Sequence, residues 1–164
     1  MNEKHNNDMR QGPNKNGYDG DVTWDIRTMN DWVNDIHEMH RKFGVHKWME
    51  ENKDNSDLMQ RFMDFRLAFL QEELDETKKA VFDSNASEVV DGLIDLCVIA
   101  IGTLDAFNVP AHEAWNRVHK ANMAKEVGIK ESRPNPLGLP DLVKPENWES
   151  PKHNDITGYI DHAL

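Results

Sequence analysis

The sequence predicts an all-α protein built around four helices. Apolar residues recur at three- and four-residue steps in four long stretches between residues 28 and 127, which is the spacing of helices with one buried face. No stretch alternates apolar and polar residues as a half-buried strand would. Five prolines between residues 134 and 151 prevent long regular structure near the C-terminal end. We therefore expect a four-helix bundle followed by a proline-rich tail.

The chain divides into three parts by composition. Residues 1–22 are mostly Asn, Gly, Lys and Asp, with little to bury, so we expect a flexible arm. Residues 23–128 hold the four helical stretches and form the predicted domain. Residues 129–164 form an extended C-terminal tail, in which 156–163 has the pattern of one or two helical turns.

The first two predicted helices are separated by a polar stretch. The first runs from Thr28 to Phe43 and is amphipathic, and Gly44 ends it. We expect residues 45–56 to be a polar connection, with Asn55 or Ser56 capping the next helix. That second helix covers 57–82. Its expected buried residues are Leu58, Met59, Phe62, Phe65, Phe69, Leu70, Leu74 and Val81.

The third and fourth predicted helices cover 86–107 and 110–127. The second half of the third helix is almost continuously apolar, which is typical of a central helix packed on several sides. The fourth begins at Pro110, a residue favoured in the first helical turn, and Gly128 ends it.

The charge of the chain excludes one class of partner. Its 164 residues include 30 acids against 19 Lys and Arg, giving a net charge of −11. Such a protein repels a nucleic-acid polymer, so we expect no DNA or RNA binding. A small phosphate-bearing ligand remains possible because it can arrive with a divalent cation.

Cysteine content and hydropathy predict a cytoplasmic protein. The single cysteine, Cys97, excludes an internal disulfide and fits a reducing compartment. No apolar run approaches the ~18 residues of a membrane span, and the polar start lacks the apolar core of a signal peptide. We therefore expect neither a membrane partner nor export.

Acidic residues lie on the faces of two helices that should be buried. On a helical wheel of the second helix, Glu73 and Glu76 fall in the same sector as Phe62 and Phe69. The third helix repeats the arrangement at steps of three and four residues, with Glu88, Asp91 and Asp95. Ionised acids in such positions need a counter-charge. Because the donors are all hard oxygens, the pattern favours Mg2+ or Mn2+ between the two helices.

Two simpler interpretations apply to some of these acids. Glu88 follows Asn85 by three residues and could complete a capping box. The run from Glu72 to Glu76, with Lys78 and Lys79, could be a solvated face with ion pairs along the helix, and we assign Asp75 to it. The wheel positions of Glu73 and Glu76 favour the metal site instead.

The acid motifs resemble those of a known family. The segment Glu72-Glu73-Leu74-Asp75-Glu76, then eleven residues, then Glu88-Val89-Val90-Asp91 is similar to the EExxE and ExxD motifs of the MazG-like all-α nucleoside triphosphate pyrophosphohydrolases. Their superfamily includes the phosphoribosyl-ATP pyrophosphohydrolases and the dimeric dUTPases and dCTPases. The resemblance extends to 91–96 with Gly102-Thr103, to 118–125, and to Lys144-Pro145 with Trp148. It covers about residues 30 to 150 and is strongest to the short single-domain members common in phages.

This resemblance implies an activity and a set of site residues. Members hydrolyse a nucleoside triphosphate between its α and β phosphates, releasing the monophosphate and pyrophosphate, with Mg2+ held by the acids. Glu72 would orient or deprotonate the attacking water. Asp95 would ligate a second ion or hold a neighbouring side chain. The metal ligands carried over by position are Glu73, Glu76, Glu88 and Asp91.

The resemblance also implies substrate contacts. Asn122 and Lys125 match a nucleotide-binding Asn-x-x-Lys region, and Lys78 is a weaker candidate cation. His40 lies on the first helix, which helps to form the base pocket in related enzymes. The pair His37-x-x-His40 has no further thiol or imidazole nearby in sequence, so we expect surface or supporting groups and no zinc site.

Three functions remain open from the sequence. The first is a Mg2+-dependent pyrophosphohydrolase of (deoxy)nucleoside triphosphates. The second is a phosphoribosyl-ATP pyrophosphohydrolase, and the third is a non-catalytic acidic bundle that binds Mg2+ or a basic partner. The family forms homodimers or dimers of dimers, so we expect a homodimer or homotetramer, located in the host cytoplasm if a phage encodes it.

Overall fold

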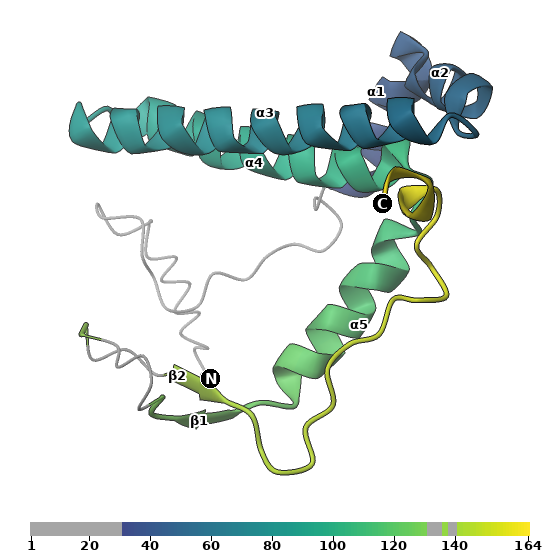
Figure 1. Ribbon diagram of the computed structural model, residues 1–164. Coiled ribbons are helices and arrows are strands. Elements are labelled where there is room, and N and C mark those ends of the chain that lie inside the picture. The colour runs from purple at the N-terminus through teal and green to yellow at the C-terminus, as the bar shows by residue number, and fades with distance from the viewer. Residues whose placement is uncertain (1–30, 131–135, 138–140) are drawn as a thin grey trace, which may run out of the picture. The chain divides into compact units, whose positions relative to one another are not determined.

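The described part of the protein is predominantly helical, as predicted. The computed structural model describes residues 31–130, 136–137 and 141–164, and the expected arm at 1–22 lies outside them. Five α-helices, one short two-stranded sheet and a final 3-10 helix make up this part (Figure 1). The all-α class is confirmed. The helices are α1 (Trp32–Phe43), α2 (Val45–Asn52), α3 (Ser56–Phe82), α4 (Ala86–Ala106) and α5 (Ala111–Met123).

Helix α2 occupies the segment for which we expected a polar connection, so that expectation is wrong. Gly44 has φ +79°, a left-handed conformation that glycine adopts readily, and it both ends α1 and starts α2. Met49 gives α2 its anchor, because its side chain is completely enclosed. The chain therefore turns at Gly44 and continues as a second short helix.

Helices α3 and α4 form a long hairpin and lie side by side (Figure 1). Each begins at a capping asparagine: Leu58 N–H donates to the side chain of Asn55, and Glu88 N–H donates to that of Asn85. The caps confirm the predicted starts of both helices to within a residue.

The main core lies at one end of this hairpin. Its buried members are Met49, Met59, Ala106, Phe107 and Ala163, which come from α2, the start of α3, the end of α4 and the last residues of the chain. The 3-10 helix η2 (Ile160–Ala163) packs on α3 and confirms the helical turn expected over 156–163. The other half of the hairpin, which carries the predicted acids, extends away from this core.

Large apolar side chains along both helices of the hairpin are exposed in the single chain. Phe65, Leu74 and Val81 were expected to be buried on α3, but they are 51%, 39% and 60% exposed. On α4, expected to be packed on several sides, the exposed apolar residues are Val90, Leu93 and Ile94. No helix in the described residues is long and apolar enough to cross a membrane.

The segment after α5 also differs from the prediction. Helix α5 ends at Met123, and β1 (Glu126–Gly128) pairs antiparallel with β2 (Asp141–Val143), so the expectation of a helix to residue 127 and of no strands is wrong here. Gly128 faces Val143, where an added Cβ would come within 2.8 Å of the valine side chain. Two strands of three residues each are too short to show a repeating pattern.

Candidate functional site

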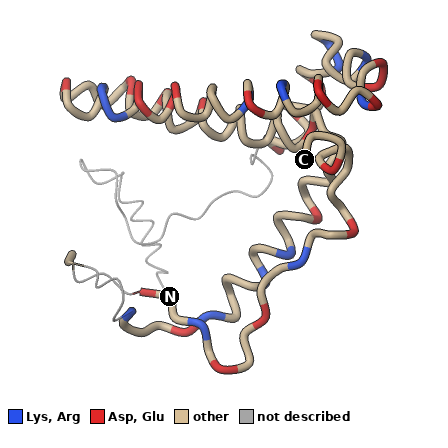
Figure 2. Tube along the Cα trace, in the orientation of Figure 1, with Lys and Arg blue, Asp and Glu red and all other residues tan. Residues whose placement is uncertain are grey.

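The predicted acids of α3 lie on the outer half of the hairpin. Glu73 is half-buried, whereas Glu72 and Glu76 are exposed. Thr77 is buried and donates its hydroxyl to the carbonyl of Glu73, 2.8 Å away. Acidic residues recur along both α3 and α4 (Figure 2).

The two sets of acids lie beside each other because the helices approach closely here. An added Cβ at Gly92 would lie only 2.3 Å from Thr77 Oγ1, so the absence of a side chain at Gly92 allows the contact. Gly92 directly follows Asp91, and Thr77 directly follows Glu76. The close approach therefore sets the acids of α3 next to those of α4.

The pKa of Glu73 reflects the proximity of the acids on α3 and α4. Partial burial and the neighbouring carboxylates of Asp95, Glu76, Glu72 and Asp91 raise the pKa of Glu73 above its ordinary value. Carboxylates from both helices thus act on one group. Among the described residues, no lysine or arginine forms an ion pair with these acids.

The lysines of α3 pair elsewhere. Lys78 lies 2.9 Å from Asp75, which confirms the solvated ion pair we assigned to Asp75, and Lys79 pairs with Asp83. The sequence had suggested Lys78 as a phosphate contact, and in this structure its ammonium is engaged by Asp75.

Glu88 stays available to the acid cluster. Its backbone N–H donates to Asn85 Oδ1 at 3.4 Å, which is half of a capping box. The other half would need the Glu88 side chain to accept from Asn85 N–H, but that N–H donates to Ala80 O at 2.9 Å. Capping therefore does not require the carboxylate of Glu88.

Asn122 and Lys125 lie together on a different part of the chain. Lys125 Nζ donates to Asn122 Oδ1 at 2.8 Å and lies 5.7 Å from the centre of the Trp148 ring. The Trp148 indole N–H donates to Ala121 O at 2.6 Å, which holds the ring against the end of α5. Among the described residues, no hydrogen bond or ion pair joins Asn122 or Lys125 to the acids of α3 and α4.

The structure corrects one part of the interpretation of the histidines. His37 and His40 were expected to be surface or supporting groups with no further imidazole nearby. His37 is exposed, whereas His40 is buried, with Nδ1 2.7 Å from an oxygen of Asp105, and burial lowers its pKa. The absence of a further imidazole is the part that is wrong. His46 also contacts Asp105, and its ring centre lies 4.4 Å from that of His37.

Sequence reasoning missed this cluster because its members are distant in the chain. His37 and His46 are nine residues apart across the turn at Gly44, and Asp105 lies at the far end of α4. Gly44 was the one sequence signal of this arrangement, because a glycine that ends a helix allows the chain to turn. Partial burial opposes ionisation of Asp105, but hydrogen bonds from His46, His37 and His40 outweigh it and lower its pKa.

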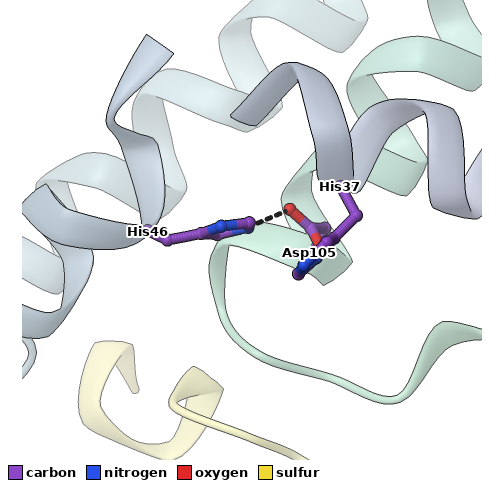
Figure 3. A group of neighbouring side chains, drawn as sticks. All are labelled: His37, His46 and Asp105. Carbon is purple, nitrogen blue, oxygen red and sulfur yellow. Dashed lines mark hydrogen bonds and ion pairs between the residues drawn. The ribbon is translucent and has the colours of Figure 1, made fainter. Parts of the chain in front are cut away.

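Only one group of potential metal ligands in the described residues is tightly gathered. The ligand atoms of His37, His46 and Asp105 lie within 4.8 Å of one another (Figure 3). The carboxylates of the predicted acid site do not form such a group among the residues described here. They are neighbours, but they are more widely spaced.

The comparison with protein families settles the general assignment. Residues 37–122, about half of the chain, match the phosphoribosyl-ATP pyrophosphohydrolase family. The chain belongs to this family. The matched segment runs from His37 to Asn122 and includes every predicted acid on α3 and α4. The protein is therefore a pyrophosphohydrolase of the superfamily that also contains the MazG-like enzymes. No curated protein matches the chain.

Proposed function

We propose that this pyrophosphohydrolase hydrolyses nucleoside triphosphates at the α–β bond, with Mg2+, to the monophosphate and pyrophosphate. The observation that carries the proposal is the meeting of acids from α3 and α4 around Glu73, whose pKa they raise. A triphosphate can bind beside these acids only together with cations, because the carboxylates alone would repel the phosphates.

The residues present fit Mg2+. All the donors are carboxylate oxygens, which hard divalent cations prefer. Partial burial and the neighbouring carboxylates raise the pKa of Glu73, and a bound cation would offset this repulsion. When bound, Mg2+ neutralises phosphate charge and lowers the pKa of a bound water. The residues that would hold it are Glu73, Glu76, Glu88 and Asp91, with Asp95 beside them, and Mn2+ would substitute.

The remaining roles follow from position. Glu72 is exposed and adjacent to Glu73, so its carboxylate is available to orient or deprotonate the attacking water. Asn122 and Lys125 offer an amide and an ammonium for phosphate oxygens, and their mutual hydrogen bond is exposed. The Lys78–Asp75 pair is also exposed, and such pairs are worth at most about 1 kcal/mol, so Lys78 can exchange its partner for phosphate.

A second substrate is favoured by one finding. The matching family is that of phosphoribosyl-ATP pyrophosphohydrolases, and phosphoribosyl-ATP carries the same triphosphate. The same acids would serve either substrate, so the choice depends on groups that contact the base and sugar. The two proposals differ only in the nucleotide, and one assay can separate them.

The deciding experiment measures pyrophosphate release. The purified protein is incubated with each canonical NTP and dNTP and with phosphoribosyl-ATP, with and without Mg2+. We expect Mg2+-dependent release from nucleoside triphosphates. Preference for phosphoribosyl-ATP would support the second substrate, and no release from any of them would support the non-catalytic bundle.

Variants test the site assignment. Glu73→Gln removes one charged ligand and several kcal/mol of transition-state stabilisation, so kcat/KM should fall at least about 100-fold. Asp75→Asn is the matched control, because Asp75 lies on the same helix but pairs with Lys78. Unchanged pyrophosphate release by Glu73→Gln would show that the metal and acid assignments are wrong.

A further inference from the structure

A second group of potential ligands lies at the opposite end of α4 from the acids. Asp105 follows Asp95 by ten residues, which corresponds to about 15 Å along the helix. Three histidines surround this one carboxylate: His37 and His40 from α1 and His46 from α2. The proposed pyrophosphohydrolase reaction does not use this cluster.

The potential ligand atoms of this cluster lie close enough together to bind one metal ion. His37 Nδ1 lies 2.7 Å from Asp105 Oδ1, and His46 Nε2 lies 2.7 Å from Asp105 Oδ2. The ligand atoms of all three residues lie within 4.8 Å of one another (Figure 3). A transition metal binds histidine nitrogen and carboxylate oxygen at about 2.0–2.2 Å, so one ion between them would contact all three after small side-chain shifts.

The fold holds these groups in place. The turn at Gly44, between α1 and α2, allows the rings of His37 and His46 to lie 4.4 Å apart. His40 is buried and holds the other side of the carboxylate, with Nδ1 2.7 Å from Oδ2. A ligand carboxylate that is itself hydrogen-bonded is a usual feature of metal sites, so His40 is a positioning residue.

The cluster also opens onto a cavity. A hollow of about 290 Å³ is lined by His37, His46 and Asp105 and by Glu50 and Tyr159. The Asp105 side chain is only 9% exposed, whereas that of His37 is 60% exposed. The carboxylate therefore lies at the base of the site and the imidazole at its rim. Glu50 also lines the cavity, but its carboxylate pairs with Lys53 and accepts a hydrogen bond from Tyr159, so Asp105 supplies the negative charge of the site.

We propose that His37, His46 and Asp105 bind a transition-metal dication such as Zn2+, with the remaining coordination positions open to the cavity. Two imidazoles and a carboxylate select such ions over Mg2+, which prefers oxygen ligands alone. Nδ1 of His37 and Nε2 of His46, which now contact Asp105, become ligands, and each of these two rings carries its proton on the other nitrogen. The ion links α1 and α2 to the end of α4.

The test is a titration of the full, untagged chain with Zn2+ after treatment with a chelator. Millimolar Mg2+ is present throughout, so that hard-cation sites among the acids are filled. We expect one Zn2+ per chain with a micromolar or lower Kd, and a rise in Tm on binding. Co2+ as a second probe should give the visible absorption of a nitrogen- and oxygen-ligated ion.

Variants assign the site. His37→Gln and His46→Gln should each weaken Zn2+ binding at least about tenfold, and the double variant should abolish the Co2+ spectrum. His119→Gln is the matched control, because His119 is exposed on α5. Glu73→Gln should leave the Zn2+ titration unchanged, so failure here is distinguishable from failure of the proposed reaction.

Two results would overturn the proposal. One is no Zn2+ binding at 100-fold molar excess by the folded wild-type protein, which would leave the cluster as hydrogen bonds alone. The other is Zn2+ binding that persists in the double histidine variant and is lost in Glu73→Gln, which would place the ion among the acids.

Discussion

Gly92 of α4 lies against Thr77 of α3, within the acid cluster. Its position leaves no room for a methyl group, since a Cβ would lie 2.3 Å from Thr77 Oγ1. The hydroxyl is also committed, because it donates to Glu73 O. A single atom at position 92 would therefore separate the two helices at the point where their acids meet.

We predict that Gly92→Ala lowers the free energy of unfolding by about 1–2 kcal/mol. The steric cost of overpacking is about 1–3 kcal/mol, and alanine's higher helix propensity offsets up to about 1 kcal/mol of it. Pyrophosphate release should fall as well, because the acids move apart. Urea denaturation and the pyrophosphate assay measure the two effects.

Thr77→Ala provides the control for this steric argument. It removes the hydroxyl that a Cβ at position 92 would meet, so the double variant should lose less stability than the sum of the two single losses. Additive losses would show that the Gly92 contact is not what holds the helices together.

At the scale of elements, the sequence predicted the long helices, and it missed the short helix α2 and the two short strands. Helices α3 and α4 are long and periodic, and their capping asparagines, Asn55 and Asn85, mark where they start. Helix α2 was missed because it has eight residues and is mostly polar, so its one buried anchor, Met49, did not stand out. The strands at 126–128 and 141–143 were missed because each is too short for a pattern.

The same distinction separates the two sites. The acids of α3 are neighbours through helical spacing alone, so their cluster could be predicted from the sequence. The histidine cluster depends on the turn at Gly44 and on Asp105, which lies 68 residues from His37. Residue spacing predicts neither the direction of that turn nor a contact between residues so far apart in the sequence.

Arg117 of α5 binds the C-terminal segment. Arg117 donates to Lys152 O at 2.7 Å and to both carboxylate oxygens of Asp155, and it also pairs with Glu113. The hydrogen bonds from Arg117 are the main cause that lowers the pKa of Asp155 to about 2. This pair links the tail to the helix in a pH-dependent way.

We predict that this attachment weakens in acid. A carboxyl whose pKa is lower in the folded state stabilises the fold above its unfolded pKa of about 4, and this contribution disappears as pH falls from about 4 to about 2. Arg117→Gln removes it. The stability difference between wild type and variant should therefore be largest above pH 5 and shrink toward pH 2.

Urea midpoints at pH 6, 4 and 2.5 check this expectation. Lys120→Gln is the control, because Lys120 is exposed on the same helix. A difference between wild type and Arg117→Gln that stays constant across this pH range would rule out the Asp155 pair as its source.

At the scale of the whole molecule, the outer half of the hairpin is incompletely covered. Val81 of α3 and Val90 and Leu93 of α4 are each more than half exposed. Large apolar side chains gathered on neighbouring helices of a soluble domain are typical of an interaction surface. The family that the sequence resembles forms homodimers and dimers of dimers. We therefore propose that a second copy of this chain covers this surface.

We predict that the protein sediments at two or four times the mass of one chain at micromolar concentration. Leu93→Glu places a charge on the apolar face and should shift the protein toward the monomer, whereas Val127→Glu, at an exposed apolar position on β1, should not. Because each chain carries a net charge of −11, association should strengthen as salt screens the repulsion.

A wild-type monomer at micromolar concentration in 0.15 M salt would contradict the prediction. Helix α4 would then keep its apolar face in water beside the acids, and the pyrophosphohydrolase site would have to be complete within one chain.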